Sequence, residues 1–118
     1  VAHPFDPYRG SQWKKGTLEA LAPHLDGIEV FNARCVDSAF NQQARAFASD
    51  FGIPEMVGSD AHSTFELGRA VLHLPDFNNA DELRSALRLS RQATRLSGSY
   101  VHLISTWAKL VKRSGMSR

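Results

Sequence analysis

The 118-residue sequence contains one cysteine, Cys35, and lacks any long apolar segment. A single thiol excludes an internal disulfide, and it also excludes a zinc site built from several thiolates. No stretch is long and apolar enough to span a bilayer, and no signal peptide is visible. We therefore expect a cytoplasmic protein with no membrane partner. Because the sequence opens at Val1 without an initiator methionine, we also expect it to be a fragment that lacks upstream sequence.

Acidic residues are absent beyond Glu82, although the formal net charge of the whole chain is only +2. A cationic segment of this kind can contact phosphates, can cover an acidic face of a missing part, or can be a solvated surface. The solvated interpretation is the commonest for clustered charge. The basic residues of the segment are Arg84, Arg88, Arg91, Arg95, Lys109, Lys112, Arg113 and Arg118.

Hydrophobic periodicity predicts strands and helices in alternation. The first helix starts at Thr17, its expected N-cap, and is expected to kink or end early at Pro23. The next helix starts at Asn41 and is followed by Gly52, at the position where a helix C-terminus favours glycine. The expected strands cover residues 1–5, 28–31, 55–58 and 69–74, and the expected helices cover 17–25, 41–51, 81–89 and 100–113.

Short connections between these elements predict a parallel α/β arrangement, either a barrel or an open sheet. In both, ligands gather at the carboxyl ends of the strands. Four polar residues fall at such ends, namely His3, Asn32, Asp60 and His62. Their shared placement favours a binding site, because core histidines have no reason to line up at one edge of a sheet.

The segment Gly58-Ser59-Asp60-Ala61-His62 carries the most informative pattern. Residues two apart in an extended segment point the same way, so Asp60 and His62 can converge on one metal ion. Imidazole nitrogen and carboxylate oxygen together suit Zn²⁺, Mn²⁺ and Fe²⁺. The expected partner is His3, which ends another short apolar segment.

Five motifs occur in a fixed order between residues 1 and 90. They are Ala2-His3-Pro4-Phe5, Gly27 to Asn32, Asn41 with Ala44, Phe47 and Ala48, Gly52-Ile53-Pro54, and Gly58 to Ser63 with Glu66-Leu67-Gly68. Together they resemble the second half of the domain of the PHP family, the polymerase and histidinol phosphatase metal-dependent phosphoesterases. An ordered set of this kind is far more specific than any single motif.

The resemblance implies a fold and a division of the chain. The family's distorted barrel of about seven βα units implies a partial (βα) barrel here, with about three to four mainly parallel strands, flanking helices and a C-terminal helix. Residues 1–90 would form the C-terminal part of the phosphoesterase domain, and residues 91–118 a basic C-terminal extension with an amphipathic helix. A barrel cut open exposes edge strands, so we expect a homodimer or the C-terminal helix to cover them.

The resemblance also implies a ligand set. The His of the family's His-Pro strand matches His3, and its Asp-x-His matches Asp60 and His62, so these three residues are the expected metal ligands and catalytic residues. The family's His-x-His pair does not occur in this sequence, and the other ligands are expected from a missing N-terminal half. The implied cofactors are Mn²⁺ or Zn²⁺, with Fe²⁺ also compatible.

Arg9 and Arg34 are candidates for binding a substrate phosphate, because each follows a strand end and a planar guanidinium can hold two phosphate oxygens. A surface position or an ion pair with Asp6 or Asp37 is the alternative for each arginine. Asn32 can orient a metal ligand or a bound water, or it can simply form a turn.

Two functions remain from the sequence. The first is hydrolysis of a phosphate ester by metal-activated water, with a nucleotide, an oligonucleotide end or a sugar phosphate as the substrate. The alternative is a non-catalytic fragment or interaction module whose metal site is incomplete.

Overall fold

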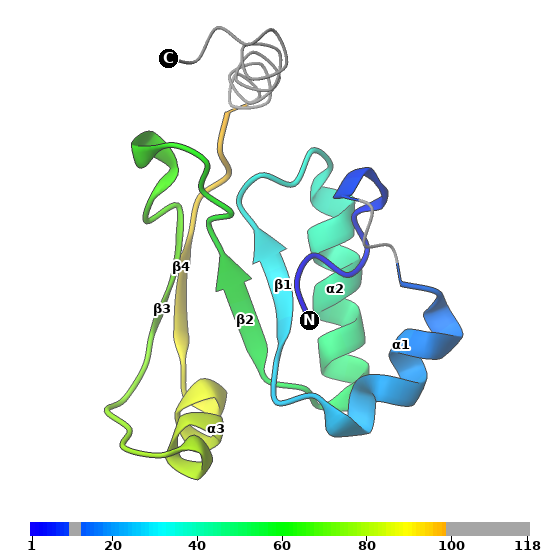
Figure 1. Cartoon of the computed structure of the whole chain (residues 1–118), viewed down its shortest axis with the longest axis vertical. Helices are drawn as coiled ribbons and strands as arrows, with labels where there is room; N and C mark the ends of the chain where they lie inside the picture. Colours follow the sequence, from blue (N-terminus) through cyan, green and yellow to red (C-terminus); the bar gives the residue numbers. More distant parts are fainter. Residues whose placement is uncertain (10–12, 99–118) are drawn as a thin grey trace, which may run out of the picture.

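The computed structural model describes residues 1–9 and 13–98, which form two small sheets flanked by helices (Figure 1). The strands are β1 (Ile28–Asn32), β2 (Glu55–Gly58), β3 (Ala70–His73) and β4 (Arg91–Thr94). The α-helices are α1 (Lys15–Leu21), α2 (Ser38–Phe51) and α3 (Ala80–Arg88), and short 3-10 helices cover Pro7–Arg9, Ala22–His24 and Thr64–Glu66.

β1 and β2 form a parallel pair that lies against α2 (Figure 1). Side chains along β1 alternate between buried and half-buried, and Ile28 and Val30 are fully buried. They pack in one cluster with Leu18 of α1 and Phe47 of α2. Because burying each such side chain contributes about 1.5–3 kcal/mol, this cluster fixes the position of the parallel pair.

The register of the parallel pair shifts once, between Glu29 and Phe31. Ile28 and Glu29 pair with Glu55 and Met56, whereas Phe31 and Asn32 pair with Val57 and Gly58. Val30 is the extra residue of this irregularity, which has the form of a β-bulge. The bulge lies immediately before the end of β1.

The expected strand at residues 1–5 was wrong, because only Val1 pairs with the sheet. The Val1 N–H group donates to Gly27 O at 3.2 Å, and the Glu29 N–H donates to Val1 O at 2.9 Å. The chain then turns away at His3, whose φ is +28°, and the following proline has no N–H to continue a ladder. The turn leaves His3 beside β1, where the site is built.

β3 and β4 form an antiparallel pair. Ser59, directly after β2, joins the two sheets, because its hydroxyl accepts from Ala70 N at 3.0 Å and donates to Ala70 O at 3.1 Å. The fold is therefore α/β, as expected. The expectation of mainly parallel strands was wrong, since one pair is parallel and the other antiparallel, and the described residues form no closed barrel.

Two helix ends have well-defined caps. Gly52 follows α2 with a φ of +64°, and the Asn79 side chain caps α3. α1 begins at Lys15, earlier than the predicted Thr17, and it gives way at Ala22 to a 3-10 turn that contains Pro23.

The start of α2 was predicted wrongly. The helix begins at Ser38, and the cap is Asp37, whose Oδ1 accepts from Ala39 N at 2.8 Å. Asn41 lies inside the helix, and its side chain bonds the end of β1: its Nδ2 donates to Asn32 O at 3.2 Å, and its Oδ1 accepts from Asn32 N at 3.0 Å. Asn41 therefore holds β1 against α2.

Residues 91–98 are the described part of the expected C-terminal extension. β4 pairs residues 91–94 with β3, so these residues belong to a sheet. The predicted helix at 100–113 lies outside the described residues. Within residues 1–9 and 13–98, no helix is long and apolar enough to cross a membrane.

Candidate functional site

The carboxyl ends of β1 and β2 lie at the same edge of the parallel pair (Figure 1). Glu29, in β1, accepts two hydrogen bonds on Oε2, from His3 N at 2.6 Å and from Asn32 Nδ2 at 3.3 Å. Asn32 Nδ2 also donates to Asp60 Oδ2 at 3.4 Å. Hydrogen bonds thus run from the backbone N–H of His3, through Glu29 and Asn32, to the Asp60 carboxylate. We call His3, Glu29, Asn32, Asp60 and His62 the site edge.

Asn32 has a defined role and orientation at this edge. Its Oδ1 accepts from Arg34 N at 2.9 Å, so its Nδ2 group must face the two carboxylates. The side chain is 2% exposed. Asn32 therefore orients Asp60 directly, and it also forms the turn after β1 that was the alternative interpretation.

Glu29 is the site-edge residue that sequence reasoning missed. It lies inside an apolar strand, where its carboxylate accepts from a backbone N–H group and from a side-chain amide. The available signal was Gly58, which pairs with Asn32 across the sheet. A Cβ atom at Gly58 would collide with Glu29 Oε1, so glycine makes room for the carboxylate.

Backbone strain is concentrated at two predicted ligands. Among the described residues, His3 (φ +28°) and Asp60 (φ +48°) are the non-glycine residues with positive φ. Such conformations cost about 1–3 kcal/mol each and persist where the surroundings impose them, commonly at functional sites. Here the bonds through Glu29 and Asn32 supply that constraint.

One ring nitrogen of His62 is hydrogen-bonded, and about half of the side chain is exposed. Its Nδ1 lies 2.7 Å from the carbonyl oxygen of Asp60, and a carbonyl can only accept, so Nδ1 carries the proton. The side chain is 52% exposed. A histidine that donates Nδ1–H to a backbone carbonyl presents Nε2 as a lone-pair donor, the usual form of a metal-binding histidine.

Arg9 contacts the site edge and also makes the ion pair with Asp6 that was the alternative interpretation, while its phosphate-binding role stays a prediction. Its Nη1 lies 2.5 Å from Asp60 Oδ2, and its Nε lies 3.6 Å from Asp6 Oδ2. A third contact joins its Nη2 to Arg34 O at 3.5 Å. The guanidinium is one-fifth exposed and therefore borders solvent at the place where Asp60 lies.

Arg34 lies in a different environment from the one expected. Its guanidinium is 3% exposed, and its Nη1 lies 3.0 Å from Glu66 Oε1 and 3.3 Å from Oε2. A side chain buried against a carboxylate does not face an incoming phosphate. Phosphate binding is therefore not proposed for Arg34.

Glu66 lies in the 3-10 turn after His62 and is also 3% exposed. Its Oε2 accepts from His62 N at 3.1 Å and from Ser63 Oγ at 2.9 Å. Burial opposes ionisation of Glu66, but these two donors and the Arg34 guanidinium outweigh it and hold the pKa of the carboxyl below its usual value. Glu66 is therefore an anion in the folded protein at neutral pH.

The donor types at the site edge fit a divalent transition metal, because they are imidazole nitrogen and carboxylate oxygen. Within the part of the chain that the structure describes, no three His, Cys, Asp or Glu side chains are grouped closely enough to hold an ion. The Asp60 carboxylate is instead bound by Arg9 and Asn32. The described residues therefore supply ligand types but no complete ligand set.

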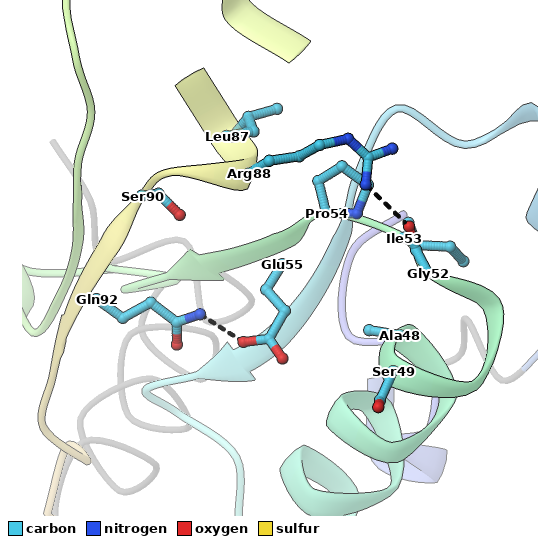
Figure 2. Close-up of a pocket in the computed structure, with 10 residues that line it drawn as sticks. All are labelled: Ala48, Ser49, Gly52, Ile53, Pro54, Glu55, Leu87, Arg88, Ser90 and Gln92. Carbon is cyan, nitrogen blue, oxygen red and sulfur yellow. Dashed lines mark hydrogen bonds between the residues drawn. The ribbon is translucent and has the colours of Figure 1, made fainter. Parts of the chain in front are cut away.

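A cavity of about 380 Å³ lies at the opposite end of β2, where the strand begins (Figure 2). Across it, Gln92 Nε2 donates to Glu55 Oε2 at 2.6 Å, and Arg88 Nη1 donates to Gly52 O at 3.2 Å. None of the site-edge residues lines this cavity. The candidate site is consequently an edge of the sheet and is separate from this cavity.

Residues 39–91 match a family model described as PHP-associated. The match confirms the resemblance to the C-terminal region of the PHP family. It begins in α2 and ends at the first residue of β4, so the PHP-associated region contains Asp60, His62 and Glu66. His3, Glu29 and Asn32 lie before it.

An uncharacterized protein of the archaeon Methanocaldococcus jannaschii is 34% identical over 81 residues. The alignment covers 66% of this chain and 34% of that protein. The chain thus spans about a third of the length of the curated relative that it matches. No solved structure matches the chain significantly.

Proposed function

We propose that the protein hydrolyses a phosphate ester with the help of divalent metal ions, Mn²⁺ or Zn²⁺, bound at the site edge. The observation that carries the proposal is the strained backbone at His3 and Asp60, the two predicted ligands that Glu29 and Asn32 connect. The PHP-associated match over residues 39–91 supports a metal-dependent phosphoesterase context.

Three side chains of this chain would hold the metal, namely His3, Asp60 and His62. Asp60 offers a carboxylate oxygen, and His62 offers Nε2 because its Nδ1–H is directed to a carbonyl. Asn32 Nδ2 donates a hydrogen bond to the Asp60 carboxylate and helps to orient it. Other ligands would come from a further part of the protein, which agrees with the much greater length of the archaeal relative.

When bound, the ion would supply activated water, because coordination lowers the pKa of water from 15.7 to about 7. Arg9 is the residue that we propose for the substrate phosphate, since its guanidinium already lies at Asp60 and borders solvent. Substrates of this class are a nucleotide, an oligonucleotide end or a sugar phosphate.

Metal content and hydrolysis test the proposal directly. The chain is loaded with Mn²⁺ or Zn²⁺, freed of excess ion, analysed for stoichiometry and assayed on a generic aryl phosphate. Because the described residues lack a complete ligand set, we expect less than one ion per chain and slow hydrolysis, both of which a chelator abolishes and added Mn²⁺ restores. His62→Ala should lose both properties, whereas His73→Ala, on β3 and outside the site edge, should retain them.

Failure to bind metal or to hydrolyse the ester would contradict the proposal for this chain. The same result in a longer protein that contains the matching upstream region would contradict it altogether. An inactive, metal-free protein that associates with itself in light scattering would instead support the interaction-module alternative.

A further inference from the structure

The buried ion pair of Arg34 and Glu66 lies beneath the segment that carries Asp60 and His62. The proposed chemistry uses neither residue. Both side chains are 3% exposed, which is unusual for charged groups and costs free energy unless each is well paired. A well-packed apolar pair of similar volume often gives equal or greater stability, so stability alone is a weak reason for this ion pair.

The remaining hydrogen bonds of Glu66 indicate what the pair does. Oε2 accepts the backbone N–H of His62 at 3.1 Å and the hydroxyl of Ser63 at 2.9 Å. One carboxylate thus bonds the segment at two consecutive residues. Arg34 Nη1 contacts both oxygens of the same carboxylate and fixes its plane.

Arg34 also connects this carboxylate to the other side of the site edge. Its backbone N–H donates to Asn32 Oδ1 at 2.9 Å, and Asn32 Nδ2 donates to Asp60 Oδ2 at 3.4 Å. The segment is therefore held at the Asp60 side chain from β1 and at the His62 backbone from Glu66. Asp60, with its φ of +48°, lies between these two attachments.

We propose that Glu66 is a positioning residue, which holds the Asp60–His62 segment in the conformation needed to bind metal, and that Arg34 orients Glu66. The inference rests on the proposed function, because it assigns a purpose to the geometry of two proposed ligands. Glu66 touches neither metal nor substrate. Groups that orient metal ligands in this way typically contribute 10–100-fold to metal affinity.

The test compares Glu66→Gln with Ile53→Val in the 118-residue chain. Ile53 is a core residue outside the site edge, and its shortening lowers stability without touching the segment. Two quantities are measured in each protein: the affinity for Mn²⁺, and the hydrogen-exchange rate of the His62 amide relative to the amides of β1. We expect Glu66→Gln to weaken Mn²⁺ binding by about 10–100-fold and to speed His62 exchange by about tenfold, and Ile53→Val to change neither.

A second variant separates positioning from folding. Arg34→Met with Glu66→Leu removes both buried charges together, and such replacements commonly preserve stability. We expect this double variant to melt within a few degrees of the wild type and still to lose Mn²⁺ affinity and His62 protection. Unchanged affinity and exchange in both Glu66 variants would overturn the positioning role, as would equal changes in Ile53→Val.

The two readouts distinguish failure of this inference from failure of the proposed function. A wild-type protein that binds no Mn²⁺ would contradict the metal site itself. The His62 exchange rate would then decide by itself whether Glu66 holds the segment: faster exchange in the Glu66 variants retains the holding role, and unchanged exchange removes it.

Discussion

The two ends of β2 are built from different kinds of interaction. At the carboxyl end, charged and amide groups are linked by short bonds, and Asp60 has a strained backbone. At the amino end, a cavity of about 380 Å³ is bordered by one glutamate–glutamine bond and one arginine–carbonyl bond (Figure 2).

In this protein, the region with the enclosed volume is therefore not the region where the candidate functional side chains come together. The cavity offers enclosed volume, but the polar groups at its lining make ordinary hydrogen bonds with each other. The site edge offers little enclosed space but brings a histidine, two carboxylates and an arginine within one hydrogen-bond network. Among the described residues, the proposed metal ligands and Arg9 lie together at the carboxyl end.

The largest difference in kcat/KM should be between two variants that each remove one carboxylate, one at either end of β2. Asp60→Ala should lower kcat/KM for an aryl phosphate by at least about 100-fold, because it removes a proposed ligand. Glu55→Ala should change it less than about twofold, since the Glu55 carboxylate contacts Gln92 and Arg45, away from the site edge. Equal losses in the two variants would erase the distinction between the ends.

A smaller effect is expected from adding one methyl group at the site edge. Gly58→Ala would push the Glu29 carboxylate away from His3 and Asn32, so we expect about a tenfold loss of Mn²⁺ affinity with the fold retained. Gly16→Ala in α1 is the matched control, because a Cβ there meets nothing within 4 Å. Calorimetric titration of both variants with Mn²⁺ checks the prediction, and an unaltered affinity in Gly58→Ala would show that Glu29 is dispensable.

At the cavity end the expected effect is on stability alone. Arg88→Ala removes the bond to Gly52 O at the C-terminus of α2, and its loss should cost about 0.5–1 kcal/mol. Urea denaturation should show a lower midpoint with an unchanged slope. Hydrolysis should remain within about twofold of the wild type, and a large loss of activity would indicate that the cavity takes part in function.

The smallest effect concerns an exposed ion pair near the start of β1. Hydrogen bonding and charge from Arg84 lower the pKa of Asp26, with Arg84 Nε 2.6 Å from Asp26 Oδ1. Because the folded-state pKa is lowered, the stabilisation is complete above the ordinary aspartate pKa of about 3.9 and is lost as the pH falls through the lowered value. The melting temperature of Asp26→Asn should therefore lie slightly below the wild type at pH 7 and converge with it in acid.

Much of the fold near the site edge was predictable because it depends on local patterns. The apolar run before Gly58 gave β2 with its observed bounds, and Gly52 marked the end of α2. β4 was missed because its residues are polar and mostly exposed, so it has no hydrophobic alternation. The strand at residues 1–5 was overpredicted because short apolar runs do not reveal the turn that His3 makes.

The candidate site was predictable in position but only partly in its partners. Asp60 and His62 were proposed from their spacing in an extended segment, and that premise was wrong because Asp60 has a φ of +48°; the two side chains still lie close, with His62 Nδ1 3.7 Å from Asp60 Oδ1. Their role as metal ligands, like that of His3, stays a prediction. Arg9 was proposed for phosphate binding without a named partner at the site, because its contact with the Asp60 carboxylate depends on a fold that brings residue 9 to residue 60. The burial of Arg34 against Glu66 is likewise a property of packing, which separation along the chain cannot show.

The bulge at Val30 affects the spacing of the site-edge residues along the sequence. Glu29 and Asn32 are three apart, and an odd separation places two side chains on opposite faces of a regular strand. The extra residue restores them to a common side, where Asn32 Nδ2 reaches Glu29 Oε2. Deleting Val30 would therefore give the two residues an even separation, which a regular strand already keeps on one side, so the odd spacing and the bulge occur together.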